Sequence, residues 1–216
     1  MKLRNAIVVA ACAAAALSGC KSEGDIVVEQ GVGITALRSV CPAVGIADHT
    51  GDITVFSPAG ATTADAIDVT AVITNVRTSC DDSDGEVYST ARFDVRAMRR
   101  DTRGARTLEL PYFGTVLRGG DAVIAKRVGT VSLTFADGQE RAVATGTAGA
   151  VVNRSEATLP ADIRNIITRT RRAGDDDAAV DPLTRPEVRA ALARASFELL
   201  VGFQLTEDQL AYNATR

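Results

Sequence analysis

The sequence predicts a mainly β protein, built as an antiparallel, immunoglobulin-like β-sandwich with amphipathic helices at its C-terminal end. From residue 25 to about residue 152, apolar and polar side chains alternate with a period of two, which is the pattern of half-buried strands. Turn residues interrupt this alternation and no helical pattern lies between the strand candidates, which favours two packed antiparallel sheets. After residue 153 the apolar spacing becomes that of helices. The buried tryptophan of immunoglobulin domains has no counterpart in this composition, so the strand order stays open.

Residues 67–74 and 87–98 show the clearest strand pattern, because every second residue is apolar in each. The segment between them, residues 77–86 (RTSCDDSDGE), is polar and predicts a turn-rich loop. In the segment 135–139, the pair Asp137-Gly138 supplies the positive φ angle of a hairpin turn between two strands. The remaining strand candidates are shorter and lie at residues 25–30, 53–56, 106–113, 122–128, 130–135 and 140–146.

Residues 154–216 are expected to form a helical C-terminal region. A short amphipathic helix is predicted within residues 159–172, and an acidic linker with glycine and proline follows at residues 173–182. A second helix is predicted over residues 186–201, since Pro186 suits a first helical turn and Gly202 a helix end. Thr206 and Gln209 then have the spacing of a capping box, which predicts a final short helix.

The first twenty residues have the pattern of a secretory signal. Lys2 and Arg4 precede an uncharged apolar run of twelve residues, Ala6 to Leu17. About 20 apolar residues are needed to cross a bilayer as a helix, so a cleaved leader is favoured over a permanent membrane span. The ending Leu17-Ser18-Gly19-Cys20 resembles the lipobox of bacterial lipoprotein precursors at all four positions.

This resemblance implies that residues 1–19 are a lipoprotein signal peptide and that Cys20 carries a diacylglycerol, with a fatty acid such as palmitate on its amino group. Two or three acyl chains would attach the protein to a membrane permanently. Lys21 stands where an inner-membrane retention signal usually has aspartate, which favours the periplasmic face of the outer membrane. Residues 20–30 would then be a tether, and residues 31–153 the sandwich domain.

The mature chain would hold two further cysteines, Cys41 and Cys80, because Cys12 leaves with the leader and Cys20 carries lipid. In an oxidising periplasm a structural disulfide between them is the simplest expectation. A redox or metal pair is the less favoured alternative, since there is no Cys-x-x-Cys spacing and His49 is the sole histidine. No cofactor is expected.

The charge of the chain argues against nucleic-acid binding. Removal of residues 1–19 takes Lys2 and Arg4 from the 24 basic residues and none of the 27 acidic ones, which leaves 22 against 27 and a formal charge of −5. A mildly acidic chain is not expected to be a general binder of nucleic acid or of anionic lipid. Aromatic residues make up only 4% of the sequence, so stacking sites for sugars or bases are scarce.

Three sequence segments are candidate sites, and each has a plainer interpretation. Asp81, Asp82 and Asp84 offer a weak calcium site with loop carbonyls, although an EF-hand is excluded because its first and last ligand positions are Cys80 and Ala91. A solvated acidic loop is the alternative.

The segment GVGITA, residues 31–36, matches a dinucleotide-binding turn, but Pro42 cuts the following helix short, so we interpret it as a chance match.

The third candidate site is the basic segment RTRR, where Arg169, Arg171 and Arg172 could contact an anion through their forked donors. Local neutralisation by the three aspartates at residues 175–177 is the alternative interpretation. The sequence holds no G-x-S-x-G or H-E-x-x-H motif, and His49 is expected in an exposed turn.

These observations favour a non-enzymatic, lipid-anchored periplasmic protein with a structural or accessory binding role in the envelope. Besides the membrane, an envelope protein is an expected partner, docked on the helix at 186–201 or on an edge strand at residues 110–114 (LPYFG). The alternative is an anchored hydrolase of envelope polysaccharide that uses paired carboxylates. Its acids would come from Asp48, Asp52, Asp81, Asp82 and Asp84.

Overall fold

The structure is a computed structural model that describes residues 39–215. The expected signal peptide, the lipid attachment at Cys20, the tether at 20–30, the strand candidate at 25–30 and the GVGITA segment at 31–36 therefore lie outside the described residues. The described chain belongs to two units: residues 39–168 and 182–215 lie in one, and residues 169–181 lie in the other.

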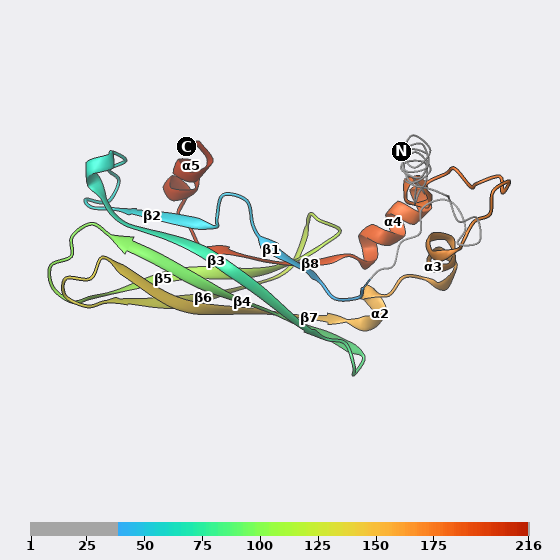
Figure 1. The fold of residues 1–216 in the computed structure, drawn as a ribbon, viewed down its shortest axis with the longest axis horizontal. Coiled ribbons are helices and arrows are strands. Elements are labelled where there is room, and N and C mark those ends of the chain that lie inside the picture. Colours follow the sequence, from blue (N-terminus) through green and yellow to red (C-terminus); the bar gives the residue numbers. More distant parts are fainter. Residues whose placement is uncertain (1–38, 216) are drawn as a thin grey trace, which may run out of the picture. The chain divides into compact units, whose positions relative to one another are not determined.

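Two four-stranded sheets make up the larger unit (Figure 1). The first has the strand order β1-β8-β5-β6, with bounds β1 (Ala43–Ile46), β8 (Phe197–Phe203), β5 (Arg106–Arg118) and β6 (Ala122–Phe135). The second has the order β2-β3-β4-β7, with bounds β2 (Asp52–Phe56), β3 (Ile67–Asp81), β4 (Glu86–Arg99) and β7 (Arg141–Asn153). Among the described strands, only β1 and β8 run parallel; the other neighbouring strands are antiparallel. The prediction of a mainly β protein with two sheets of mostly antiparallel strands is confirmed.

The core lies between the inward faces of the two sheets. Along β4, buried and exposed residues alternate almost without interruption, so one face of the strand is removed from water. Phe93 of β4, Phe135 of β6 and Phe203 of β8 are fully buried there, and each such side chain contributes about 1.5–3 kcal/mol. Gly146 of β7 accommodates Phe93, because a Cβ atom at this position would collide with the phenyl ring.

The predicted disulfide between Cys41 and Cys80 is present, with the two Cα atoms 6.1 Å apart. Cys41 directly precedes β1 of the first sheet and Cys80 lies in β3 of the second. The bridge therefore links the two sheets. Closing a loop of this length stabilises a chain by about 4 kcal/mol in the chain-entropy model.

The loop predicted at residues 77–86 is shorter in the structure, because β3 continues to Asp81 and β4 begins at Glu86. Residues 77–81 pair with residues 88–92 of β4, and this cross-strand pairing outweighs the polar composition of the segment. The register shifts between Thr74 and Arg77, where Asn75 takes a φ angle of 53°. This bulge lets the ladder resume beyond it.

Two predictions about the strands after residue 105 are wrong. Residues 122–128 and 130–135 are one continuous strand, β6, since Gly129 pairs with Tyr112 within the ladder. The Asp137-Gly138 turn does have a positive φ angle, 75° at Gly138, but it does not close a hairpin. It carries the chain from β6 of the first sheet to β7 of the second.

The helix predicted over residues 186–201 is wrong in its second half. Helix α4 (Pro186–Ala195) begins at the proline, as expected, and is followed by strand β8. The segment FELLVGF alternates with a period of two, and its inward residues Phe197, Leu199, Val201 and Phe203 are all buried. Strand β8 lies between β1 and β5, so the expected helical region from residue 154 contributes a central strand to the first sheet.

The segment LPYFG is not an edge strand, because it belongs to β5, which lies between β8 and β6. Pro111 is tolerated there since the ladder with β8 ends opposite Tyr112. The Pro111 carbonyl still accepts a hydrogen bond of 2.9 Å from the Gln204 backbone amide. A docking edge at this proline is therefore excluded.

Short helices lie outside the sheets, namely α2 (Arg154–Ala157), α3 (Ala161–Thr168), α4 and α5 (Glu207–Thr215), with 3-10 turns at Ala64–Ala66 and Pro182–Thr184. A second apolar cluster joins α3 to α4 through Ile163, Ile167 and Val188. The capping box of α5 forms as predicted, because Thr206 and Gln209 exchange hydrogen bonds of 3.0 and 3.3 Å. Within residues 39–215, the helices are too short or too polar to span a membrane.

Candidate functional site

The inward face of β6 changes character along the strand. Near the turn to β7, Val131, Leu133 and Phe135 are at most 3% exposed. The next inward positions toward the start of the strand are Gly129, Arg127 and Ala125, of which the last two are exposed. The two sheets therefore enclose the second half of β6 and leave its first half uncovered.

A hollow of about 540 Å³ opens at this place, between β5 and β6 on one side and β4 and β7 on the other. We call it the inter-sheet slot. Its volume lies within the range of roughly 300–1,000 Å³ that is usual for small-ligand sites. Its lining is about equally apolar and polar, and the apolar part of the wall comes from Val116, Ile124, Ala125, Ala150, Val152 and Phe197.

Small residues allow the floor of the slot to form. Gly114 of β5 faces β7 so closely that an added Cβ atom would lie 2.7 Å from the Cβ atom of Ala148. Gly149 of β7 lies beside Ser89 of β4, and both line the slot. A larger side chain at Gly114 would push the sheets apart, so this glycine sets their separation.

Ser89 lines the slot from an inward position of β4, and its hydroxyl group is itself buried. The residue is 2% exposed, and its Oγ atom has no hydrogen-bond partner among the described residues. Buried hydroxyl groups are nearly always hydrogen-bonded, because burial without a partner is costly. A ligand with a polar oxygen or an amide would supply that partner.

Arg127 brings a positive charge to the same slot. It lies opposite Gly114 on the inward face of β6 and is exposed. It forms no salt bridge with the described acidic residues. A guanidinium group in this position offers forked donors to a carboxylate or phosphate.

Arg118 of β5 connects the residues at the end of the slot next to α2. Its guanidinium group lies 5.4 Å from the centroid of the Phe197 ring, and its Nε atom donates a 2.7 Å hydrogen bond to the Arg194 carbonyl. Its Nη1 atom is 3.6 Å from a carboxylate oxygen of Glu156, which lines the slot. Arg118 is thus occupied by the protein itself, whereas Arg127 remains available to a ligand.

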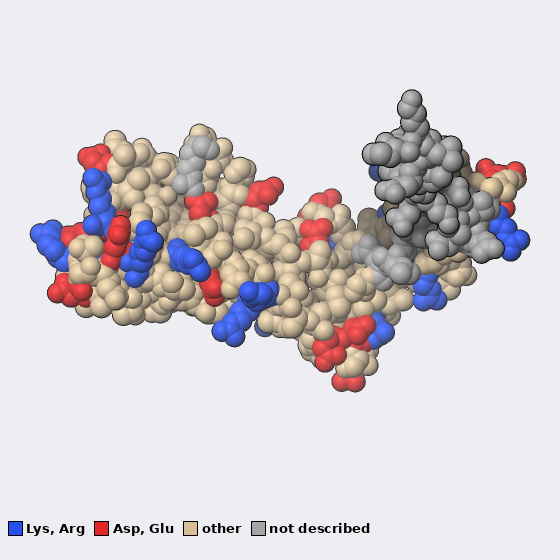
Figure 2. Space-filling view, in the orientation of Figure 1, with Lys and Arg blue, Asp and Glu red and all other residues tan. Residues whose placement is uncertain are grey.

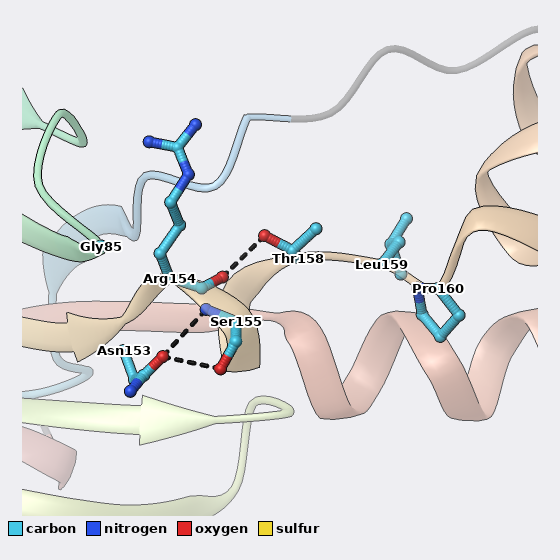
Figure 3. Close-up of a pocket in the computed structure, with 7 residues that line it drawn as sticks. All are labelled: Gly85, Asn153, Arg154, Ser155, Thr158, Leu159 and Pro160. Carbon is cyan, nitrogen blue, oxygen red and sulfur yellow. Dashed lines mark hydrogen bonds between the residues drawn. The ribbon is translucent and has the colours of Figure 1, made fainter.

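A second hollow, of about 590 Å³, lies beside α2 and is drawn in Figure 3. Its polar side chains serve the local backbone: Asn153 Oδ1 accepts hydrogen bonds from the Ser155 amide and hydroxyl at 2.9 and 2.7 Å. The Thr158 hydroxyl donates to the Arg154 carbonyl at 2.6 Å, and the Arg154 side chain points away from the other residues drawn. This hollow offers a ligand fewer open polar groups than the inter-sheet slot does.

The aspartates of the proposed calcium site are not brought together as ligands. Within residues 39–215, no group of three His, Cys, Asp or Glu side chains is arranged to hold a metal ion. Hydrogen bonds from the Ser83 hydroxyl and amide lower the pKa of Asp81. Asp82 lies 3.5 Å from the Arg154 guanidinium group. Asp81, Asp82 and Asp84 therefore fit the solvated acidic loop better than a cation site.

The arginines of the proposed anion contact are close to acids of their own segment. Arg169 forms a salt bridge with Asp177, and Nε of Arg171, which is 1% exposed, lies 3.5 Å from the same carboxylate. The Arg172 amide donates a 3.0 Å hydrogen bond to Asp175. Asp175 and Asp177 thus take the place that an external anion would have.

Within residues 39–215, the carboxyl groups do not favour a paired-carboxylate hydrolase. A general acid needs a raised pKa, but hydrogen bonds lower the pKa of Asp65, Asp81 and Asp101. His49 is exposed in the turn after β1, as expected, with a φ angle of 60°.

Comparison of the chain with protein-family models, curated proteins and solved structures found no match. The function must therefore be inferred from the site.

The sequence interpretation missed both polar groups of the slot. Ser89 could have been found, because it is a hydroxyl residue at an apolar position of a clear strand pattern. Arg127 could not have been found, because the sequence prediction divided residues 122–135 into two strands at Gly129. The alternation that places Arg127 on the same face as Val131 and Leu133 was therefore lost.

Proposed function

We propose that this protein is a non-enzymatic binding protein of the bacterial cell envelope that holds an apolar chain with an anionic end in the inter-sheet slot. One observation carries the proposal: a hollow with apolar walls and several polar groups is lined by Ser89, whose buried hydroxyl has no partner, and by Arg127. Ligand pockets combine apolar walls with a small number of polar groups.

The chemistry of the walls defines the class of ligand. Aliphatic and phenyl groups along the slot favour a chain, since burial of apolar surface contributes about 25 cal/mol per Å². Arg127 would pair with a terminal carboxylate or phosphate, and a charge-assisted hydrogen bond contributes about 1.5–3 kcal/mol. Ser89 would bond an oxygen of the ligand, while Glu156, which faces Arg118, would disfavour a second negative charge at the far end.

The location of the protein is part of the proposal. The lipobox at residues 17–20 supports attachment of lipid at Cys20, and the Cys41–Cys80 disulfide fits an oxidising compartment such as the periplasm. We place the protein on the periplasmic face of the outer membrane. An envelope protein partner also stays a prediction.

The finer description of the fold is likewise proposed: an immunoglobulin-like sandwich with amphipathic C-terminal helices. Two antiparallel sheets around one shared apolar core support it. An experimental structure would test the strand order.

Binding of palmitate to the purified protein tests the occupant of the slot. We expect Arg127→Gln to weaken palmitate binding by about tenfold or more, because the carboxylate loses its charged partner. Lys126→Gln is the matched control: it removes the same charge from the same strand, but Lys126 lies over the Phe113 ring. Equal affinity of both variants, or no binding of palmitate by the parent protein, would contradict the proposed ligand class.

The anchor is tested independently in cells supplied with labelled palmitate. The parent protein is expected to carry the label after denaturation and to stay with the membranes after a high-salt wash, and Cys20→Ala to do neither, because salt and denaturation remove contacts that are not covalent. A Cys20→Ala protein that still carries the label would disprove attachment at this residue.

A further inference from the structure

The outward face of the second sheet carries four arginines. Arg77 belongs to β3, Arg92 and Arg96 to β4, and Arg141 to β7, and all four are exposed. The strand register places them on one side, because Arg77 lies opposite Arg92 and Arg141 lies opposite Met98, which shares its face with Arg96. We call this surface the arginine face. In Figure 2, basic side chains follow one another across the region of β3 and β4.

The protein does not neutralise these arginines. The four guanidinium groups form no salt bridge with a described acidic residue. Asp94 lies between Arg92 and Arg96 along β4, but its carboxylate accepts hydrogen bonds from Asn75 and Thr145 at 2.8 and 3.5 Å. Like charges directly opposite each other, as at Arg77 and Arg92, destabilise a sheet. The pair therefore lowers the stability of the folded protein.

Apolar side chains lie between the arginines. Val72, Met98 and Val143 are 44%, 43% and 64% exposed. The register puts Val72 and Val143 on either side of Arg96. A hollow of about 400 Å³ lies over these residues. The face therefore combines fixed positive charge with exposed aliphatic groups, while the whole chain has a formal charge of −3.

We propose that the arginine face docks on the surface of an anionic lipid bilayer. Membrane-surface binding uses apolar groups at the headgroup boundary together with basic residues that attract anionic lipids, and this face offers both. A sheet presents them in one plane, with Arg92 and Arg96 about 13 Å apart along the strand. This inference does not depend on the ligand in the inter-sheet slot.

Vesicle binding of the full chain tests the inference, with Cys20→Ser in every variant to prevent acylation. The probes are vesicles of phosphatidylcholine alone and vesicles with equal parts of phosphatidylglycerol. We expect the double variant Arg92→Gln/Arg96→Gln to bind the anionic vesicles on the order of 30-fold more weakly, since each basic residue near such a surface contributes roughly fivefold in affinity. Added salt should weaken binding of the parent protein in the same direction.

The control is Arg164→Gln/Arg189→Gln, which removes two exposed charges from α3 and α4 and should change vesicle affinity by less than about twofold if the face is responsible. Circular dichroism confirms that both double variants are folded. Equal losses in both variants, or equal binding of the parent to neutral and anionic vesicles, would overturn the inference. Binding to soluble polyglutamate without binding to vesicles would also overturn it, and would indicate an acidic protein partner.

Discussion

Arg99 and Arg127 both lie at inward positions of the sandwich, but at opposite ends of it. Arg99, at the end of β4, is 1% exposed. Its guanidinium group donates hydrogen bonds of 2.7–2.9 Å to the carbonyls of Gln139, Gly104, Thr102 and Ala136 and lies 5.2 Å from the centroid of the Phe135 ring. Arg127 has none of these contacts and is exposed in the inter-sheet slot.

The difference separates a structural cation from a binding cation. Every hydrogen bond of Arg99 ties together the loops at the closed end of the sandwich, so its charge is compensated by the fold. The carbonyls that it contacts belong to the β4–β5 loop and to the turn between the sheets. At the open end the fold leaves Arg127 uncompensated. Arg127 without an acidic partner and the buried Ser89 hydroxyl without a hydrogen-bond partner both line the slot, which favours a ligand that completes this end.

The comparison predicts unequal effects on stability. We expect Arg99→Met to lower the free energy of unfolding by about 3–5 kcal/mol, because four backbone carbonyls lose the buried donor that joins them. Arg127→Gln should change it by less than about 0.5 kcal/mol. Urea unfolding followed by circular dichroism measures both, since the sequence lacks tryptophan. A large loss of stability in Arg127→Gln would show that this arginine also has a structural role.

The substitution Ser89→Ala is expected to change the free energy of unfolding by a smaller amount and in the opposite direction. Removing a buried hydroxyl that has no partner should stabilise the ligand-free protein by about 0.5–1 kcal/mol. The same urea titration measures this gain, and Thr90→Ala, on the exposed face of the same strand, is the control. Destabilisation by Ser89→Ala would mean that the hydroxyl is hydrogen-bonded within the free protein, and the case for a ligand at this atom would fail.

The accuracy of the sequence predictions depended on the range of the interactions that decide each element. Strands at 67–74 and 87–98 were predicted because alternation is visible within a few residues. The helix at 186–201 was wrong beyond Ala195 because Leu199 fits both a helical stripe and a strand face, and only pairing with β1 and β5 selects the strand. The loop at 77–86 was wrong because long pairing with β4 outweighs local polarity.

The candidate site was less predictable than the fold. Metal and anion candidates were chosen from clusters of like residues along the chain, and the structure uses those residues for salt bridges and local hydrogen bonds. The slot instead combines residues from five strands and α2. No local pattern marks such a set, since its members are separated by up to 109 residues of chain, from Tyr88 to Phe197.

By itself, the sequence determined which residues alternate, where glycine allows the chain to turn, and which two cysteines of the body would form a bridge. These properties depend on side-chain chemistry and on local backbone geometry. Only the tertiary structure decided that β8 enters the first sheet, that β6 and β7 belong to different sheets, and that the sheets separate around Ser89 and Arg127. These features depend on which distant segments pack together, and packing is a property of the whole chain.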